Sequence, residues 1–149
     1  MENKLSKTGL ISVGADHAGF ALKQEILEYL KRQGIETEDV GCTSTASVDY
    51  PDFARKVAES VGSGRANRGI LVCGSGIGMA MAANKTAGVR AAPVRDVASA
   101  RLTRQHNDAN VLCLGGRFTT KEKAMKIIDA FLSTPFEGGR HERRVKKIP

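Results

Sequence analysis

The chain contains no tryptophan, and aromatic residues make up only 5% of its 149 residues. A surface that binds nucleic acid by stacking bases on aromatic side chains is therefore poorly supplied. The net charge of +7 favours an anionic partner, yet the basic residues are spread along the chain apart from one cluster near its end. A basic balance equally suits a small phosphorylated substrate. We therefore expect no nucleic acid as a partner.

Cysteine is also scarce, and the three residues at positions 42, 73 and 113 form no C-x-x-C pair. An odd number of such thiols is typical of a reducing compartment and argues against a disulfide framework. No apolar run is long enough to span a bilayer, and the first residues lack the apolar core of a signal peptide. We expect a cytoplasmic protein without membrane contact, folded as a single domain over residues 1–149.

Apolar runs alternate with amphipathic segments along the chain, which predicts an α/β fold with a parallel sheet and helices on both of its faces. Strands are expected at 10–14, 35–40, 69–72, 89–94 and 110–114, and helices at 18–33, from 50, at 77–85, 96–105 and 119–132. The second strand is the most polar, which favours a place near the sheet edge. Ligands of such sheets bind at the carboxyl ends of the strands, so residues there are the first candidates for a site.

The strongest candidate is Cys73-Gly74-Ser75-Gly76-Ile77-Gly78, which follows the third apolar strand and opens a helix. Glycines allow backbone N–H groups to approach an anion closely, and the helix adds the positive end of its dipole. A thiolate at Cys73 would be stabilised there and could act as a base or nucleophile. The loop lacks the last glycine of a dinucleotide fingerprint and the arginine of a phosphatase loop, because Met79 occupies both positions. A tight turn with an inert cysteine is the alternative interpretation. Cys113, inside an apolar strand, is interpreted as a buried core thiol.

Three further segments carry polar residues at ends of elements. Asp16-His17 follows the first strand and could serve a site or simply cap the next helix. His106 lies at a helix end, where it could offset the dipole. In the basic tail, Arg140 and Arg144 would share one face if the segment is helical, and two guanidinium groups so placed could clamp a phosphate. The three histidines show no metal-ligand spacing, and we expect neither a metal nor a cofactor.

Six motifs together resemble the ribose-5-phosphate isomerase type B family, which also contains the galactose-6-phosphate isomerase subunits. They are Gly14-Ala15-Asp16-His17-Ala18-Gly19, Asp49-Tyr50-Pro51, Cys73 to Gly78, Ala83-Asn84-Lys85, Arg104-Gln105-His106-Asn107-Asp108 and Glu137-Gly138-Gly139-Arg140-His141. The resemblance runs from about residue 10 to 148, in the same order and at similar spacing. It leaves residues 1–8 as an N-terminal extension and makes the tail, 137–149, part of the site.

The resemblance implies a Rossmann-like αβα sandwich with a five-stranded parallel sheet. It also implies a homodimer or dimer of dimers whose active sites are shared between subunits, and metal-free interconversion of an aldose phosphate with its ketose phosphate. By this resemblance Cys73 is the base that moves a proton between C2 and C1, Ser75 assists proton transfer at the sugar oxygens, and His106 opens the sugar ring with Asp16 nearby.

The remaining site residues also follow from the resemblance. It places His17, Arg140 and Arg144 at the phosphate, Asn107 and Tyr50 at the sugar, and His141 and Arg117 close to the site. The backbone of Gly74, Gly76, Ile77 and Gly78 would line the anion-binding loop.

Two alternatives stay open. The first is an isomerase for a four- or six-carbon sugar phosphate, such as galactose 6-phosphate or allose 6-phosphate. In the galactose branch the catalytic parts are divided between two different chains, whereas Cys73 and His106 occur in one chain here. The second is a basic domain that binds nucleic acid or senses sugar phosphates without turnover.

Overall fold

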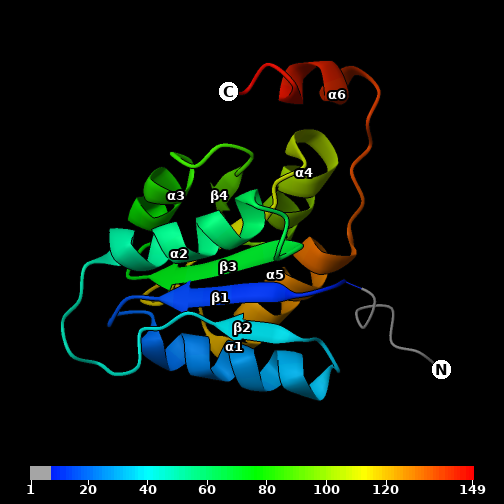
Figure 1. The fold of residues 1–149 in the computed structure, drawn as a ribbon. Helices are drawn as coiled ribbons and strands as arrows, with labels where there is room; N and C mark the ends of the chain where they lie inside the picture. The colour runs from blue at the N-terminus through cyan, green and yellow to red at the C-terminus, as the bar shows by residue number, and fades with distance from the viewer. Residues whose placement is uncertain (1–7) are drawn as a thin grey trace.

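The computed structural model describes residues 8–149 and contains a five-stranded, entirely parallel sheet covered by helices on both faces (Figure 1). The strands are β1 (Ile11–Ala15), β2 (Thr37–Asp39), β3 (Arg68–Cys73), β4 (Ala91–Pro93) and β5 (Val111–Gly115), in the spatial order β2-β1-β3-β5-β4. The helices are α1 (Phe20–Arg32), α2 (Tyr50–Gly62), α3 (Ile77–Ala83), α4 (Val97–Asn107), α5 (Lys121–Ser133) and α6 (Arg140–Val145). The predicted α/β fold is confirmed, and the polar second strand lies at an edge.

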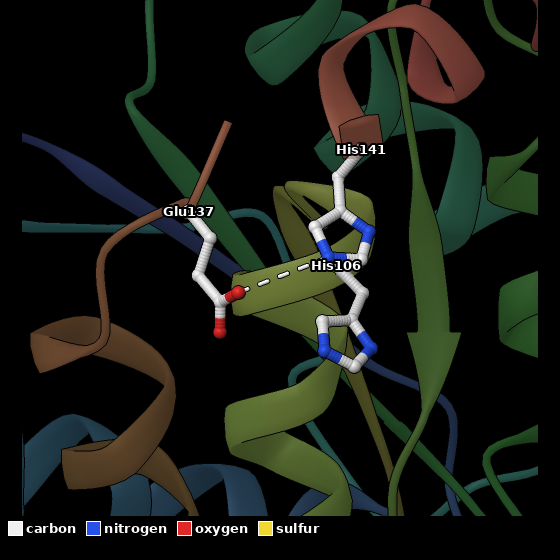
Figure 2. A group of neighbouring side chains, drawn as sticks. All are labelled: His106, Glu137 and His141. Carbon is white, nitrogen blue, oxygen red and sulfur yellow. Dashed lines mark ion pairs between the residues drawn. The ribbon is translucent and has the colours of Figure 1, made fainter. Parts of the chain in front are cut away.

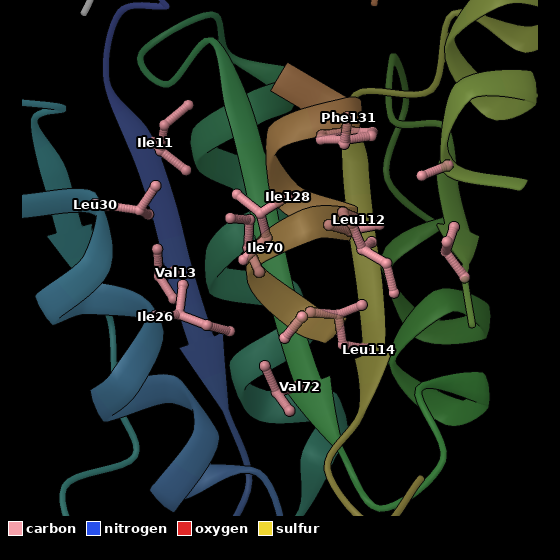
Figure 3. Close-up of a cluster of buried hydrophobic side chains, with 14 of the residues drawn as sticks. Ile11, Val13, Ile26, Leu30, Ile70, Val72, Leu112, Leu114, Ile128 and Phe131 are labelled. Carbon is pink, nitrogen blue, oxygen red and sulfur yellow. The ribbon is translucent and has the colours of Figure 1, made fainter. Parts of the chain in front are cut away.

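Alternating side chains of the central strands supply two separate cores. Ile70 and Val72 point to the face covered by α1, α4 and α5, where Phe131 also packs (Figure 3). Leu71 and Cys73 point to the opposite face, against α2 and α3. Cys113 is completely buried in this second core, as predicted. Burial raises the pKa of its thiol, and the nearby Cys73 raises it further, so Cys113 stays protonated.

Two helices begin later than predicted, because a side chain just before each helix binds nearby backbone N–H groups. Helix α1 begins at Phe20 instead of residue 18, because the Asp16 carboxylate takes the N–H groups of Ala18 and Gly19 in a turn. Helix α5 begins at Lys121, since the Thr120 hydroxyl accepts the N–H of Lys123 as an N-cap. Such caps satisfy N–H groups that have no partner in the first turn of a helix.

The strand order places a crevice between β1 and β3. The chain leaves β1 toward β2 on one side and then returns to β3 on the other, and this reversal is where open α/β sheets bind ligands. Asp16 follows β1 and Cys73 ends β3, so both lie at this position. The basic tail forms α6, as the sequence analysis considered, whereas the N-terminal extension lies outside the described residues except for Thr8. Within residues 8–149, no helix has the length and apolar character needed to cross a membrane.

Candidate active site

Cys73 ends the buried strand β3, and its side chain is almost fully enclosed, with 4% of its surface exposed. The N–H of Gly76 donates a hydrogen bond to its Sγ at 3.1 Å. The Ser75 hydroxyl accepts the N–H of Ile77 at 3.2 Å, two residues beyond the thiol. Among the described residues, the N–H groups of Gly74, Ser75 and Gly78 have no acceptor. The loop therefore offers a thiol, a hydroxyl and three unused backbone donors within six consecutive residues.

Only glycine fits several positions of this loop. Gly76 has a φ of +80°, and a Cβ there would lie 3.0 Å from the carbonyl carbon of Leu114 in the neighbouring strand. The end of β5 lies against the loop in turn, because Gly116 donates its N–H to the carbonyl of Cys73 at 2.7 Å. These contacts fix the orientation of the loop above the sheet.

The Asp16–His17 turn lies beside the loop and is firmly held. The Asp16 N–H donates to the carbonyl of Val72 in β3 at 3.1 Å, and its carboxylate accepts two backbone N–H groups at 3.0 and 3.1 Å. His17 Nδ1 accepts the N–H of Val48 at 3.2 Å, so in the neutral ring the hydrogen is on Nε2. Asp16 therefore closes a turn ahead of α1 and does not cap that helix, whose N-cap is Gly19. The turn holds Asp16 at the pocket.

Tyr50 and Arg117 form walls of the same pocket. The ring of Tyr50, the first residue of α2, lies over Gly78, where a Cβ would come within 2.7 Å of it. The Arg117 guanidinium lies over Gly74, 3.3 Å from the position of a Cβ, and brings a positive charge. The pocket has a volume of about 640 Å³, within the range of small-molecule sites. The predicted residues that it gathers are Asp16, His17, Tyr50, Cys73, Gly74, Ser75, Ile77, Gly78 and Arg117, with Gly76 buried directly beneath them.

The pocket also contains residues that the sequence analysis did not select. Met81 and Phe118 line it and are largely exposed, at 67% and 58%. Ile77 and Tyr50 add further exposed apolar surface at the same rim. A helical repeat from Ile77 to Met81 could have indicated a shared face for these two, but no sequence signal places Phe118 beside them.

The other predicted site residues lie elsewhere. His106 and Asn107 end α4, and Asp108 just after them lines a cavity with Arg68, the first residue of β3. Cys73 ends that same strand, and five residues of extended chain span on the order of 16 Å. Figure 1 shows the arrowheads of β1 and β3 on the left and α4 with α6 on the upper right. His106, Asn107, Arg140, His141 and Arg144 are therefore separate from the Cys73 pocket within one chain.

This second group has its own geometry. The rings of His106 and His141 stack with centroids 4.4 Å apart and an interplanar angle of 11° (Figure 2). His141 is buried while Arg140 and Arg144 are exposed on the same short helix. Burial lowers the pKa of His141, and His106 and Arg140 lower it further, with Glu137 opposing. The neutral imidazole is therefore favoured in this cationic surrounding.

One group of side chains has the composition of a metal site. The donor atoms of His106, Glu137 and His141 all lie within 4.8 Å of one another, and His141 Nε2 is 3.7 Å from Glu137 Oε2 (Figure 2). Zinc at its usual bond lengths holds neighbouring ligand atoms roughly 3.4 Å apart, so these side chains would have to move closer together. The stacked rings also direct their nitrogen lone pairs along parallel planes instead of toward one point. These residues have the chemistry of a metal site but not its geometry.

Comparison with known proteins shows which family the chain resembles. The family model for Ribose/Galactose Isomerase matches residues 11–148. The chain is 48% identical over 138 residues to ribose-5-phosphate isomerase B of Escherichia coli strain K12, covering 93% of each protein. It also resembles the crystal structure of a ribose 5-phosphate isomerase from Thermotoga maritima, with a TM-score of 0.92 and 53% identity, over 94% of this chain and 97% of that one.

A further solved structure carries a sugar phosphate. Ribose-5-phosphate isomerase B from Mycoplasma genitalium, with bound ribulose-5-phosphate, has a TM-score of 0.90 and 48% identity to this chain, covering 93% of each. The match extends over nearly the whole chain, including both groups of candidate residues. The protein therefore belongs to the ribose/galactose isomerase family.

Proposed function

We propose that the protein interconverts ribose 5-phosphate and ribulose 5-phosphate, with Cys73 as the base. The observation that carries this proposal is the Gly76 N–H that donates to the Cys73 sulfur at the base of a glycine-lined pocket. The thiolate is the form of cysteine that can accept a proton, and the Gly76 N–H is placed to donate to its sulfur. The similarity to a relative whose structure holds ribulose-5-phosphate supports the choice of a five-carbon substrate.

The proton balance of the reaction is simple. The Cys73 thiolate removes the proton from C2 of the open-chain aldose, and the electron pair forms an enediolate. The thiol then returns the proton to C1, while the Ser75 hydroxyl moves the oxygen-bound proton between O1 and O2. Negative charge on the enediolate oxygen needs preorganised donors, and one such donor can contribute about 3 kcal/mol. The unused N–H groups of Ser75 and Gly78 are suited to that role.

The site is complete only if a second copy of the chain contributes to it. One chain holds Cys73 and His106 at opposite edges of its sheet. The pocket at Cys73 is bordered by exposed Met81 and Phe118, an apolar rim of the kind that marks a protein interface. In a homodimer, or a dimer of dimers, the partner would place its own His106 over this pocket.

The remaining residues are assigned by their chemistry. His106 opens the furanose ring, with Asp16 nearby, and the guanidinium groups of Arg140 and Arg144 bind the phosphate together with the Nε2–H of His17. Asn107 and Tyr50 contact the sugar hydroxyls, whereas His141 and Arg117 lie beside the site. The proposed reaction uses no metal, because the thiolate and the backbone donors supply the base and the charge stabilisation. We place the enzyme in the cytoplasm, where free thiols stay reduced.

The decisive experiment is the conversion of ribose 5-phosphate by wild type and Cys73→Ala, in the presence of EDTA and a reductant. We expect turnover in the wild type, a loss of at least about a thousandfold in the variant, and unchanged binding of the sugar phosphate. Cys113→Ala is the matched control, because that thiol lies in the core and keeps its proton. Full activity in Cys73→Ala would refute the assignment of the base, and loss of wild-type activity in EDTA would refute the metal-free reaction.

A further inference from the structure

A second cavity lies at the edge of the sheet opposite Cys73. It has a volume of about 600 Å³ and is bounded by the amino ends of β1, β3 and β5. The residues that matter for its chemistry are Leu10, Arg65, Arg68, Arg90, Asp108 and Asn110. None of them belongs to the residues assigned above to isomerisation, so this cavity needs an explanation of its own.

The charge around this cavity is strongly unbalanced. Asp108 Oδ1 is 2.7 Å from Arg104 Nη1, and its Oδ2 is 3.4 Å from Arg90 Nη2. Arg68 has no carboxylate within ion-pair distance anywhere in residues 8–149. Two guanidinium groups therefore share the Asp108 carboxylate and that of Arg68 has none, so two positive charges stay uncompensated. Arg65, also at the cavity, is paired separately with Glu38.

These guanidinium groups repel one another. Burial lowers the pKa of Arg68, and Arg104 and Arg90 lower it further, with only Asp108 opposing them. An arginine side chain nevertheless stays charged in proteins. The fold thus holds like charges together at a cavity, an arrangement that an anion would relieve.

Hydrogen-bond donors are also left over at this cavity. Arg68 Nη1 donates to the carbonyl and the side-chain oxygen of Asn67, at 3.0 and 3.4 Å, whereas its Nε and Nη2 meet no acceptor among the described residues. Arg90 uses Nε for the carbonyls of Asn107 and Asp108 and Nη2 for the Asp108 carboxylate, which leaves Nη1 free within the same part of the chain. A planar guanidinium with free N–H groups matches the oxygens of a phosphate.

We propose that this cavity is a binding site for a small molecule with a di- or polyphosphate group, distinct from the pocket at Cys73. Arg68 and Arg90 supply the contacts to the phosphate oxygens, and the cavity volume leaves room for the rest of such a molecule. Arg90 also holds the backbone carbonyls of Asn107 and Asp108. An anion bound to Arg90 therefore changes the electrostatic environment at the end of α4, next to His106.

The test is a titration of the ¹⁵N-labelled full chain with inorganic pyrophosphate at constant ionic strength, followed by amide chemical shifts. We expect saturable shifts at Gly9, Asn67 and Asn110. Arg68→Gln should weaken this binding by about tenfold or more, since it removes a charge-assisted contact. Arg55→Gln removes the same charge from an exposed position on α2, and it should change pyrophosphate binding by less than about twofold.

A second variant separates this site from the proposed isomerase site. Arg140→Gln should leave the shifts at Gly9 and Asn67 unchanged, even if it abolishes binding near α6. Shifts that do not saturate, that occur only around Gly74 and Gly76, or that are equal in Arg68→Gln and wild type would overturn the proposal. If Arg68→Gln does not fold, the location of the wild-type shifts alone decides, because the two pockets share no residue.

Discussion

Two inactive variants of this protein are expected to restore each other's activity when they assemble together. Cys73→Ala removes the proposed base and His106→Asn removes the proposed ring-opening group, so each homo-oligomer is expected to be inactive. In a mixed dimer, one pocket combines the intact Cys73 of one chain with the intact His106 of the other. The second pocket then carries both substitutions. A purified mixed dimer should therefore recover about half of the wild-type turnover per dimer, and an unsorted equal mixture about a quarter.

The expectation follows from the distance between the two groups in one chain. Cys73 ends β3, whereas His106 lies near Asp108 and the start of the same strand. The length of that strand, on the order of 16 Å, far exceeds the approximately 3 Å over which catalytic groups exchange protons. No side-chain rotation closes this gap. A complete site within one chain would require α4 to leave the sheet that it covers.

The assay is turnover of ribose 5-phosphate by mixed dimers that carry two different affinity tags and are purified on both. The control pairs wild type with a Cys73→Ala/His106→Asn double variant. Shared sites predict that this control is inactive, since each pocket lacks one group, whereas sites within one chain predict half of the wild-type turnover. Activity in the control together with none in the complementing pair would refute the shared site.

Three further predictions concern the scaffold. Gly76→Ala should lower the free energy of unfolding by about 1–2 kcal/mol in urea, because φ is +80° there and Leu114 crowds the new Cβ; an unchanged midpoint would contradict this. Asp39→Asn should cost roughly 2 kcal/mol by removing the negative charge that pairs with the buried Lys23 ammonium, and Lys23→Met should cost less. Equal thermal shifts in these two variants would argue against that reasoning. Burial alone would raise the pKa of Glu38, but hydrogen bonds from Arg65 and Ser60 outweigh it and lower the pKa. The resulting stability is present above pH 4.5 and lost as the pH falls below it, and Glu38→Gln should flatten that part of the acid unfolding curve.

Much of the fold could be predicted because periodicity and composition agree in the central strands. Gly69 to Val72 and Asn110 to Leu114 read as buried strands, and both are buried on two faces. Boundaries were harder, since they depend on particular side-chain contacts. Asp16 delays the start of α1, and the edge strand β4 pairs over only Ala91–Pro93, since the N–H of Arg90 just before it donates to the Asn110 side chain. A proline is tolerated at such an edge position.

The half of the site around Cys73 could be predicted from the rule that strand ends of a parallel sheet meet at one edge. Asp16, Cys73 and Arg117 each follow a strand, and the structure gathers them in one pocket. The same topology also predicts where His106, in the other half of the site, lies relative to Cys73. The sequence motifs alone do not give this position. A helix that follows a parallel strand runs back along the sheet, so α4 returns the chain to the amino edge before β5 begins. His106 sits where α4 ends and therefore cannot meet Cys73 in its own chain. The stacking of His141 on His106 is different, because it depends on how α6 packs against α4, and no spacing between positions 106 and 141 encodes that contact.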